Sequence, residues 1–149
     1  MRRIIVNTDG KAKNLFKLHR ISQMWISELE FFFDEQHFYQ DLIELYLLDL
    51  LKGESLDELA AIEKKLKKAV NKGNLLLLEV RTHEKQLATL FESEHLKGEK
   101  EFRNLHKKLA NKFDQFVDSN KRLKKVIFDV IKKVMQKHKQ KLLMAHLSS

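Results

Sequence analysis

Apolar residues recur at alternating intervals of three and four along most of this 149-residue chain. That spacing lines one side of an α-helix, and over several heptads it is typical of helices packed as in a coiled coil. Between residues 14 and 51, nine of the eleven positions in this register are apolar or aromatic. The positions are Leu15, Leu18, Ser22, Trp25, Leu29, Phe32, Gln36, Tyr39, Ile43, Tyr46 and Leu50. The pattern predicts a long first helix.

Two further helices follow from the same spacing, over residues 55–97 and 99–146. In the second, the positions are Leu56, Leu59, Glu63, Leu66, Val70, Gly73, Leu77, Val80, Glu84, Leu87, Phe91 and Glu94. In the third, they are Phe102, His106, Leu109, Phe113, Phe116, Asn120, Leu123, Ile127, Val130 and Val134. Gly53 and Gly98 mark the breaks, and Ser55 with Glu58 forms a capping box for the second helix.

The predicted fold is all-α, an up-down-up bundle of three long helices with coiled-coil-like packing, because short connections make sequential helices antiparallel. Residues 14–149 form a single helical-bundle domain, and residues 1–13 precede it as a tail or a short extended segment. Gly73 leaves an alternative open, since a break there gives a four-helix bundle. We favour continuity because the heptad register passes through Gly73 unchanged.

Composition supports this fold and excludes several classes of protein. There is no proline, where average usage would give roughly seven, and glycine occurs four times. The chain has no cysteine, which excludes disulfide frameworks, thiolate metal sites and a cysteine nucleophile. No apolar run approaches the roughly 18 residues of a membrane span. We therefore expect a cytoplasmic protein without a transmembrane segment.

Polar residues within the predicted core fall at two levels of the bundle. Folding about Gly53 and Gly98 pairs residue i of one helix with about 106 − i and 196 − i of the next. One level then holds Gln36, Gly73 or Asn74, and Asn120. The other holds Ser22, Glu84 or Thr89, and His106. We interpret these levels as devices that fix the register of the helices, which is the best-attested use of such residues. The alternative is a pocket that binds a small ligand or a metal ion.

Catalysis and metal binding have weak support in the sequence. No phosphate-cradling glycine loop and no serine nucleophile elbow is present. The best metal-ligating cluster is Glu28, His83, Glu84 and His106, whose levels agree within two turns, and we predict that these four side chains do not converge on an ion. We expect no cofactor and no enzymatic activity.

Charge is uneven along the chain, whose formal net charge is +8. Residues 14–52 carry three basic and seven acidic groups, whereas residues 121–141 carry nine basic groups and one acidic group. Part of this surplus neutralises the acidic first helix. The rest is a candidate anion-binding surface for an acidic protein, anionic lipid or nonspecific nucleic acid. Its residues are Lys121, Arg122, Lys124, Lys125, Lys132 and Lys133.

The first helix has more apolar residues than one buried side can use. A second stripe runs through Met24, Phe31, Phe38, Leu42 and Leu45, and the third helix should overhang its neighbours from about Gln136 to Leu147. Apolar surface left exposed in this way usually marks an interface. We predict a homo-oligomer, most simply a two-fold dimer. The interface candidates are Phe31, Phe38, Leu42, Leu45, Leu142 and Leu143.

Overall fold

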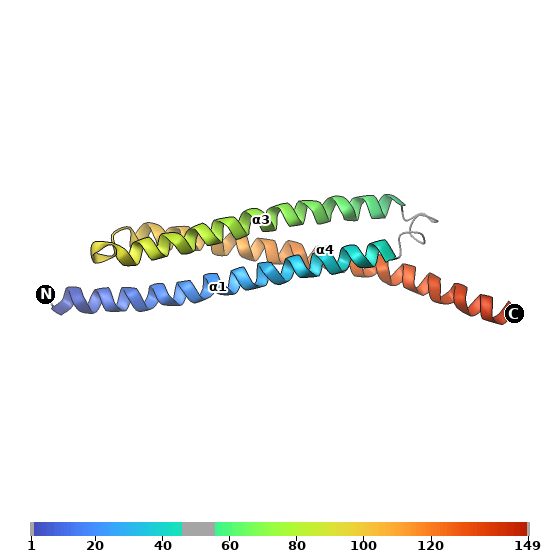
Figure 1. The fold of residues 1–149 in the computed structure, drawn as a ribbon, viewed down its shortest axis with the longest axis horizontal. Helices are drawn as coiled ribbons and strands as arrows, with labels where there is room; N and C mark the ends of the chain where they lie inside the picture. The colour runs from blue at the N-terminus through green and yellow to red at the C-terminus, as the bar shows by residue number, and fades with distance from the viewer. Residues whose placement is uncertain (1, 46–55, 149) are drawn as a thin grey trace. The chain divides into compact units, whose positions relative to one another are not determined.

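The computed structural model describes residues 2–45 and 56–148, and the regular structure within them is entirely helical. Three long helices follow one another, α1 (Arg2–Leu45), α3 (Leu56–Glu92) and α4 (Glu99–Ser148), with a 3₁₀ turn η1 (Glu94–Leu96) before α4 (Figure 1). The all-α prediction with three long helices is therefore confirmed. Among the described residues, no helix has both the length and the apolar character needed to cross a membrane.

The structure tests the predicted start of the first helix and the predicted continuity of the second helix at Gly73. α1 begins at Arg2, so the extended alternative expected for residues 1–13 is wrong for residues 2–13, which are helical. This stretch has no proline, and Gly10 costs a helix only about 1 kcal/mol, so nothing in it stops the helix. α3 runs through Gly73 without a break, as predicted. The expected end of the first helix, the Gly53 turn and the Ser55 cap lie outside the described residues.

The connection between α3 and α4 is longer than the sequence suggests. α3 ends at Glu92, five residues before the predicted end. The backbone then turns through positive φ angles at His95 (54°), Leu96 (52°) and Gly98 (94°). Leu96 is buried in a cluster with Leu15, Leu87, Leu90 and Phe102, which anchors the turn on the helices.

The described residues group into two compact units, and each takes a segment of every long helix. Unit 1 comprises the residues up to Phe32 together with Lys72–Phe116. Here α1 and α3 run antiparallel, since Phe16 stacks on Phe91 with ring centroids 4.9 Å apart and Glu30 lies 3.6 Å from Arg81. α4 runs parallel to α1: Trp25 stacks on His106 (4.7 Å), and Phe32, later in α1, contacts Phe116, later in α4 (4.7 Å).

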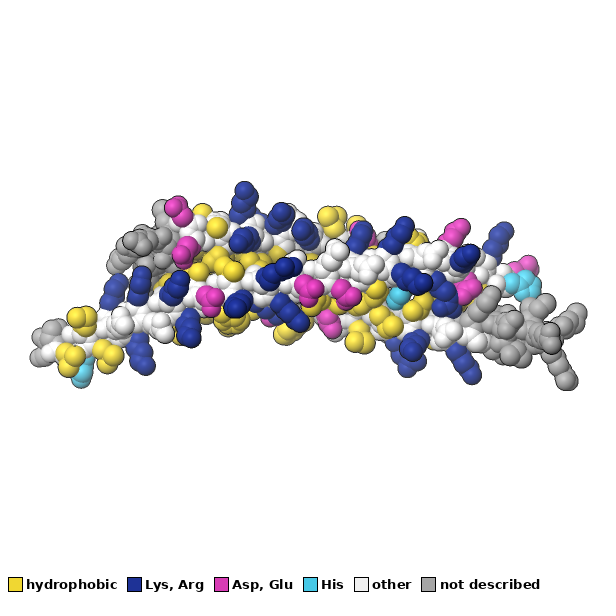
Figure 2. Space-filling view, turned by 180° about the vertical axis from the view of Figure 1, so that it is seen from behind, with side chains coloured by type: hydrophobic (Ala, Val, Ile, Leu, Met, Phe, Trp, Pro, Cys, Tyr) yellow, Lys and Arg dark blue, Asp and Glu magenta, His cyan; other side chains and the backbone are white. Residues whose placement is uncertain are grey.

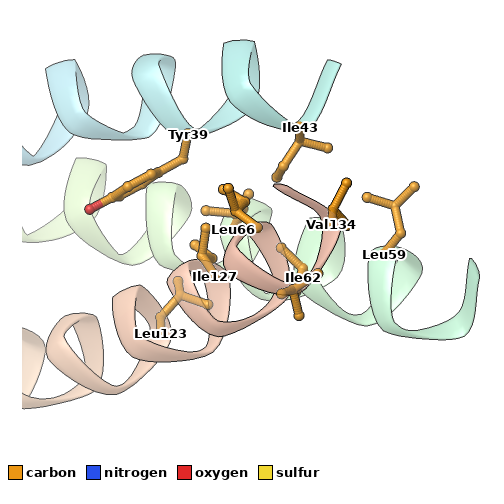
Figure 3. Packing of buried hydrophobic residues seen from close by; sticks show 10 residues of the cluster. Tyr39, Ile43, Leu59, Ile62, Leu66, Leu123, Ile127 and Val134 are labelled. Carbon is orange, nitrogen blue, oxygen red and sulfur yellow. The ribbon is translucent and has the colours of Figure 1, made fainter. Parts of the chain in front are cut away.

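Unit 2 comprises Phe33–Asn71 and Val117–Ser149. Its core takes side chains from all three helices, which point toward one another in Figure 3. The buried residues are Tyr39, Ile43, Leu59, Ile62, Leu66, Leu123, Ile127, Val130, Ile131 and Val134. Their burial is the main stabilising contribution to this unit.

The predicted core positions of α1 and α4 are buried or half-buried throughout the described residues. In α3, several of the predicted positions are wrong by one residue. The structure buries Ile62, Leu76, His83 and Leu90 where the sequence prediction chose Glu63, Leu77, Glu84 and Phe91. The two registers share every second position and the chain offers four consecutive leucines at 75–78, so periodicity alone does not separate them.

Candidate functional site

The second apolar stripe of α1 is solvent-exposed, as its excess over one buried side suggested. Met24 and Phe31 in unit 1 are 60% and 63% exposed, and Phe38 and Leu45 in unit 2 are 56% and 72% exposed. Leu42 is the exception among the interface candidates, because it is half-buried against the core of unit 2. Large apolar side chains thus recur every seven residues on the outside of one helix.

Within unit 2 this stripe adjoins α4. Glu35, Phe38, Leu42 and Leu45 follow one another at intervals of three and four, so they share one side of α1. Lys124, Phe128, Ile131 and Met135 share one side of α4 for the same reason. The Lys124 Nζ lies 2.7 Å from the Glu35 Oε2, which shows that these two sides face each other across the α1–α4 contact.

Aromatic contacts support the same arrangement, and they show which residues of α1 and α4 lie at the same level. The Phe38 and Phe128 rings both contact the buried Tyr39 ring, at centroid distances of 6.0 and 5.6 Å. The Glu35–Lys124 and Tyr39–Phe128 contacts each join residues 89 positions apart. Because α1 and α4 run parallel, Leu45 is therefore level with residue 134. We call the resulting surface the α1–α4 apolar face; it consists of Phe38, Leu42, Leu45, Phe128 and Met135.

Phe128 and Met135 are 52% and 49% exposed, and the sequence prediction missed both. A signal for them exists, because Phe128, Met135 and Leu142 are spaced by seven, as are the residues of the α1 stripe. Lysines occupy many of the neighbouring positions, so this apolar row is difficult to recognise in the sequence.

The C-terminal part of α4 extends past the last core residue. Val134 is buried, whereas every residue from 135 to 147 is exposed, and Figure 1 shows this end of α4 running past the described ends of α1 and α3. We call residues 136–147 the overhang. Its apolar side chains are Leu142 (60% exposed), Leu143 (55%), Met144 (71%) and Leu147 (83%). Figure 2 shows hydrophobic side chains gathered at the tip of this helix, with Lys and Arg following along it.

The six candidate anion-binding residues have two different environments. Lys124 is paired with Glu35, which agrees with partial neutralisation of the acidic first helix. The other five are exposed on α4, namely Lys121, Arg122, Lys125, Lys132 and Lys133.

A histidine pair lies in the core of unit 1. The His83 Nε2 and the His106 Nδ1 are 3.1 Å apart, and the side chains are 2% and 7% exposed. The Phe102 ring stacks on His83 with centroids 4.0 Å apart, and Trp25 stacks on His106. Burial, followed by the charge of His106, lowers the pKa of His83 to about 4. Burial, followed by the charge of Arg103, also lowers the pKa of His106.

The four metal-ligand candidates separate into different surroundings. Only His83 and His106 are brought together, and Glu84 is paired with His19 instead. Glu28 is exposed. In the part of the chain that the structure describes, no three His, Asp or Glu side chains form a group suited to a metal ion.

The polar levels differ in composition from the prediction. Ser22 and His106 are buried, but His83 takes the place expected for Glu84 or Thr89, and Thr89 is exposed. In unit 2, Gln36 is 4% exposed. Within the described residues, both amide atoms of Gln36 and the Asn120 Oδ1 have no hydrogen-bond partner.

Comparison of the chain with protein-family models, with curated proteins and with solved structures finds no match.

Proposed function

We propose that this chain is a non-catalytic cytoplasmic protein that assembles with copies of itself through the α1–α4 apolar face, most simply as a dimer. The observation that carries the proposal is the pair of adjoining exposed rows on two parallel helices, Phe38 with Leu45 and Phe128 with Met135. Two neighbouring helices with a shared apolar outer side present the surface against which a further helix packs in a four-helix arrangement. Contiguous apolar surface of this kind is uncommon on monomers.

The test replaces residues at the centre of this face. Phe38→Glu and Phe128→Glu should each weaken self-association by roughly tenfold or more, since a carboxylate buried in the interface loses its hydration. Both side chains are more than half exposed in the single chain, so its helix content should change little, as should its unfolding midpoint at concentrations where the wild type is monomeric. Sedimentation equilibrium measures association, and circular dichroism measures helix content.

Leu78→Glu is the matched control, because Leu78 is 64% exposed and lies on α3, outside the face. It should leave association unchanged. Equal weakening by the control, or no weakening by either phenylalanine variant, contradicts an interface at this face.

A second candidate function rests on the basic part of α4. Lys121, Arg122, Lys125, Lys132 and Lys133 are exposed, and lysine surfaces attract polyanions without recognising base sequence. This function predicts weak binding of any DNA duplex that falls steeply with salt. Fluorescence anisotropy at two salt concentrations, with Lys132→Glu/Lys133→Glu as the variant, distinguishes it from self-association.

A further inference from the structure

The overhang is a basic and apolar helical segment with exposed side chains. Residues 136–147 contain Lys137, Lys139 and Lys141 and no acidic residue, and every one of them is exposed. The positions that would continue the core of unit 2 beyond Val134 are Lys137 and Lys141, which are polar. The overhang therefore does not extend the intramolecular packing, and its leucines lie outside that register.

The described end of α1 has the opposite charge. Residues 33–45 contain Asp34, Glu35, Asp41 and Glu44 and no lysine or arginine. Asp34, Phe38, Asp41 and Leu45 follow one another at intervals of four, three and four, so the two aspartates flank the exposed apolar residues on one side of the helix. Both aspartates are exposed.

Length also matches. Twelve residues of helix extend about 18 Å and thirteen extend about 20 Å at 1.5 Å per residue. The overhang and residues 33–45 of α1 thus offer helical segments of nearly equal length, opposite charge and exposed apolar side chains.

We propose that the overhang of a second copy of this chain occupies the α1–α4 apolar face, lying antiparallel to residues 33–45 of α1. Two-fold symmetry makes the exchange reciprocal, so each copy gives its overhang to the other and receives one. The leucines of the overhang cover Phe38 and Leu45, and its lysines lie against Asp34 and Asp41. This inference rests on the proposed self-association and adds the identity of the partner segment.

The test reverses the two sets of charges separately in the full-length chain. One variant carries Lys137→Glu, Lys139→Glu and Lys141→Glu, and the other carries Asp34→Lys, Asp41→Lys and Glu44→Lys. In a homodimer of either variant, like charges face each other in both halves of the interface. The self-association of each variant should therefore weaken by roughly tenfold or more. Mixed in equal amounts, the two variants have complementary charges at both contacts and should form a heterodimer. Sedimentation equilibrium and native mass spectrometry report the two homodimers and the heterodimer.

Outcomes separate the partner segment from self-association itself. Loss of association in each variant with recovery in the mixture supports the exchange of overhangs. If both variants associate like the wild type, the overhang is not the partner, although the chain still self-associates. Weakening without recovery on mixing also overturns the proposal. If the overhang variant keeps its mass but loses binding to phosphatidylserine-containing vesicles, the overhang serves a lipid surface instead. A wild-type chain that is monomeric at all concentrations refutes the proposed function as well.

Discussion

The contact between His83 and His106 in the core of unit 1 depends on the protonation state of the two rings. Their facing nitrogens are 3.1 Å apart, so one ring donates to the other only while the pair is neutral or shares a proton. Glu84 and Gln86 lie on the same helix as His83, His19 pairs with Glu84 from α1, and Arg103 acts on His106 from α4. The stacked Phe102 and Trp25 rings present no oxygen or ring-nitrogen acceptor for the hydrogen bond of an additional proton.

The stability of the protein should therefore fall in acid. The pKa of His83 is lowered from 6.5 to about 4, so the unfolded chain binds more protons than the folded chain between these values. Stability from this group is full above pH 6.5 and is lost on acidification, at up to about 1.4 kcal/mol per pH unit. Urea unfolding from pH 7 to pH 4.5 measures the loss, and His83→Phe should reduce the slope. An NMR titration in which the folded His83 ring protonates near pH 6.5 contradicts this account.

Gln36 tests the energetic cost of a buried polar side chain. Its amide atoms have no hydrogen-bond partner within the described residues, and it is 4% exposed. Gln36→Leu should raise the free energy of unfolding by about 1 kcal/mol, because an unpaired buried amide is costly and leucine is apolar. Gln40→Leu is the control, since Gln40 is exposed on the same helix and should change stability by less than about 0.5 kcal/mol. A destabilised Gln36→Leu variant in urea unfolding shows instead that this amide is paired.

At the scale of elements, the three long helices were predictable from the sequence. Their register, meaning which residues face the core, was predictable only in part. The absence of proline and the sustained heptads specify long helices, and the core positions of α1 and α4 follow directly from them. α3 was mis-registered because consecutive leucines satisfy two registers. Its pairing with α4 was displaced too: folding about Gly98 pairs His83 with residue 113, whereas the structure pairs it with His106. The turn over residues 93–98 begins earlier than the glycine, and Ser93 alone among its leading residues is of a type common in turns.

Two glycines provide a prediction at the same scale. Gly98 has a φ of +94° and open space where an added Cβ would lie, so Gly98→Ala should destabilise the protein by about 1 kcal/mol through backbone strain alone. Gly10 lies within α1, also with nothing within 4 Å of an added Cβ, so Gly10→Ala should stabilise by up to about 1 kcal/mol. Thermal unfolding of both variants compares them. If the two substitutions shift the unfolding temperature in the same direction, helix propensity and turn geometry do not govern these sites.

At the scale of the whole molecule, the sequence predicted that apolar surface would remain exposed, and the structure shows where. Phe31, Phe38 and Leu45 were predictable because a seven-residue spacing beside a filled core stripe has no intramolecular partner. The adjoining Phe128 and Met135 were not, since their significance depends on the α1–α4 register, which the Glu35–Lys124 pair establishes. The sequence placed His83 and His106 only within two turns of each other, and their direct contact was not predictable because it requires the correct register of α3.

The mass of the wild-type chain in solution tests the central claim most directly. Light scattering over a dilution series into the high micromolar range should show the weight-average mass rise from the 17.7 kDa of one chain toward twice that value, since a buried two-helix apolar face favours the dimer as concentration increases. A mass that stays at that of one chain throughout the series contradicts self-association through the α1–α4 apolar face.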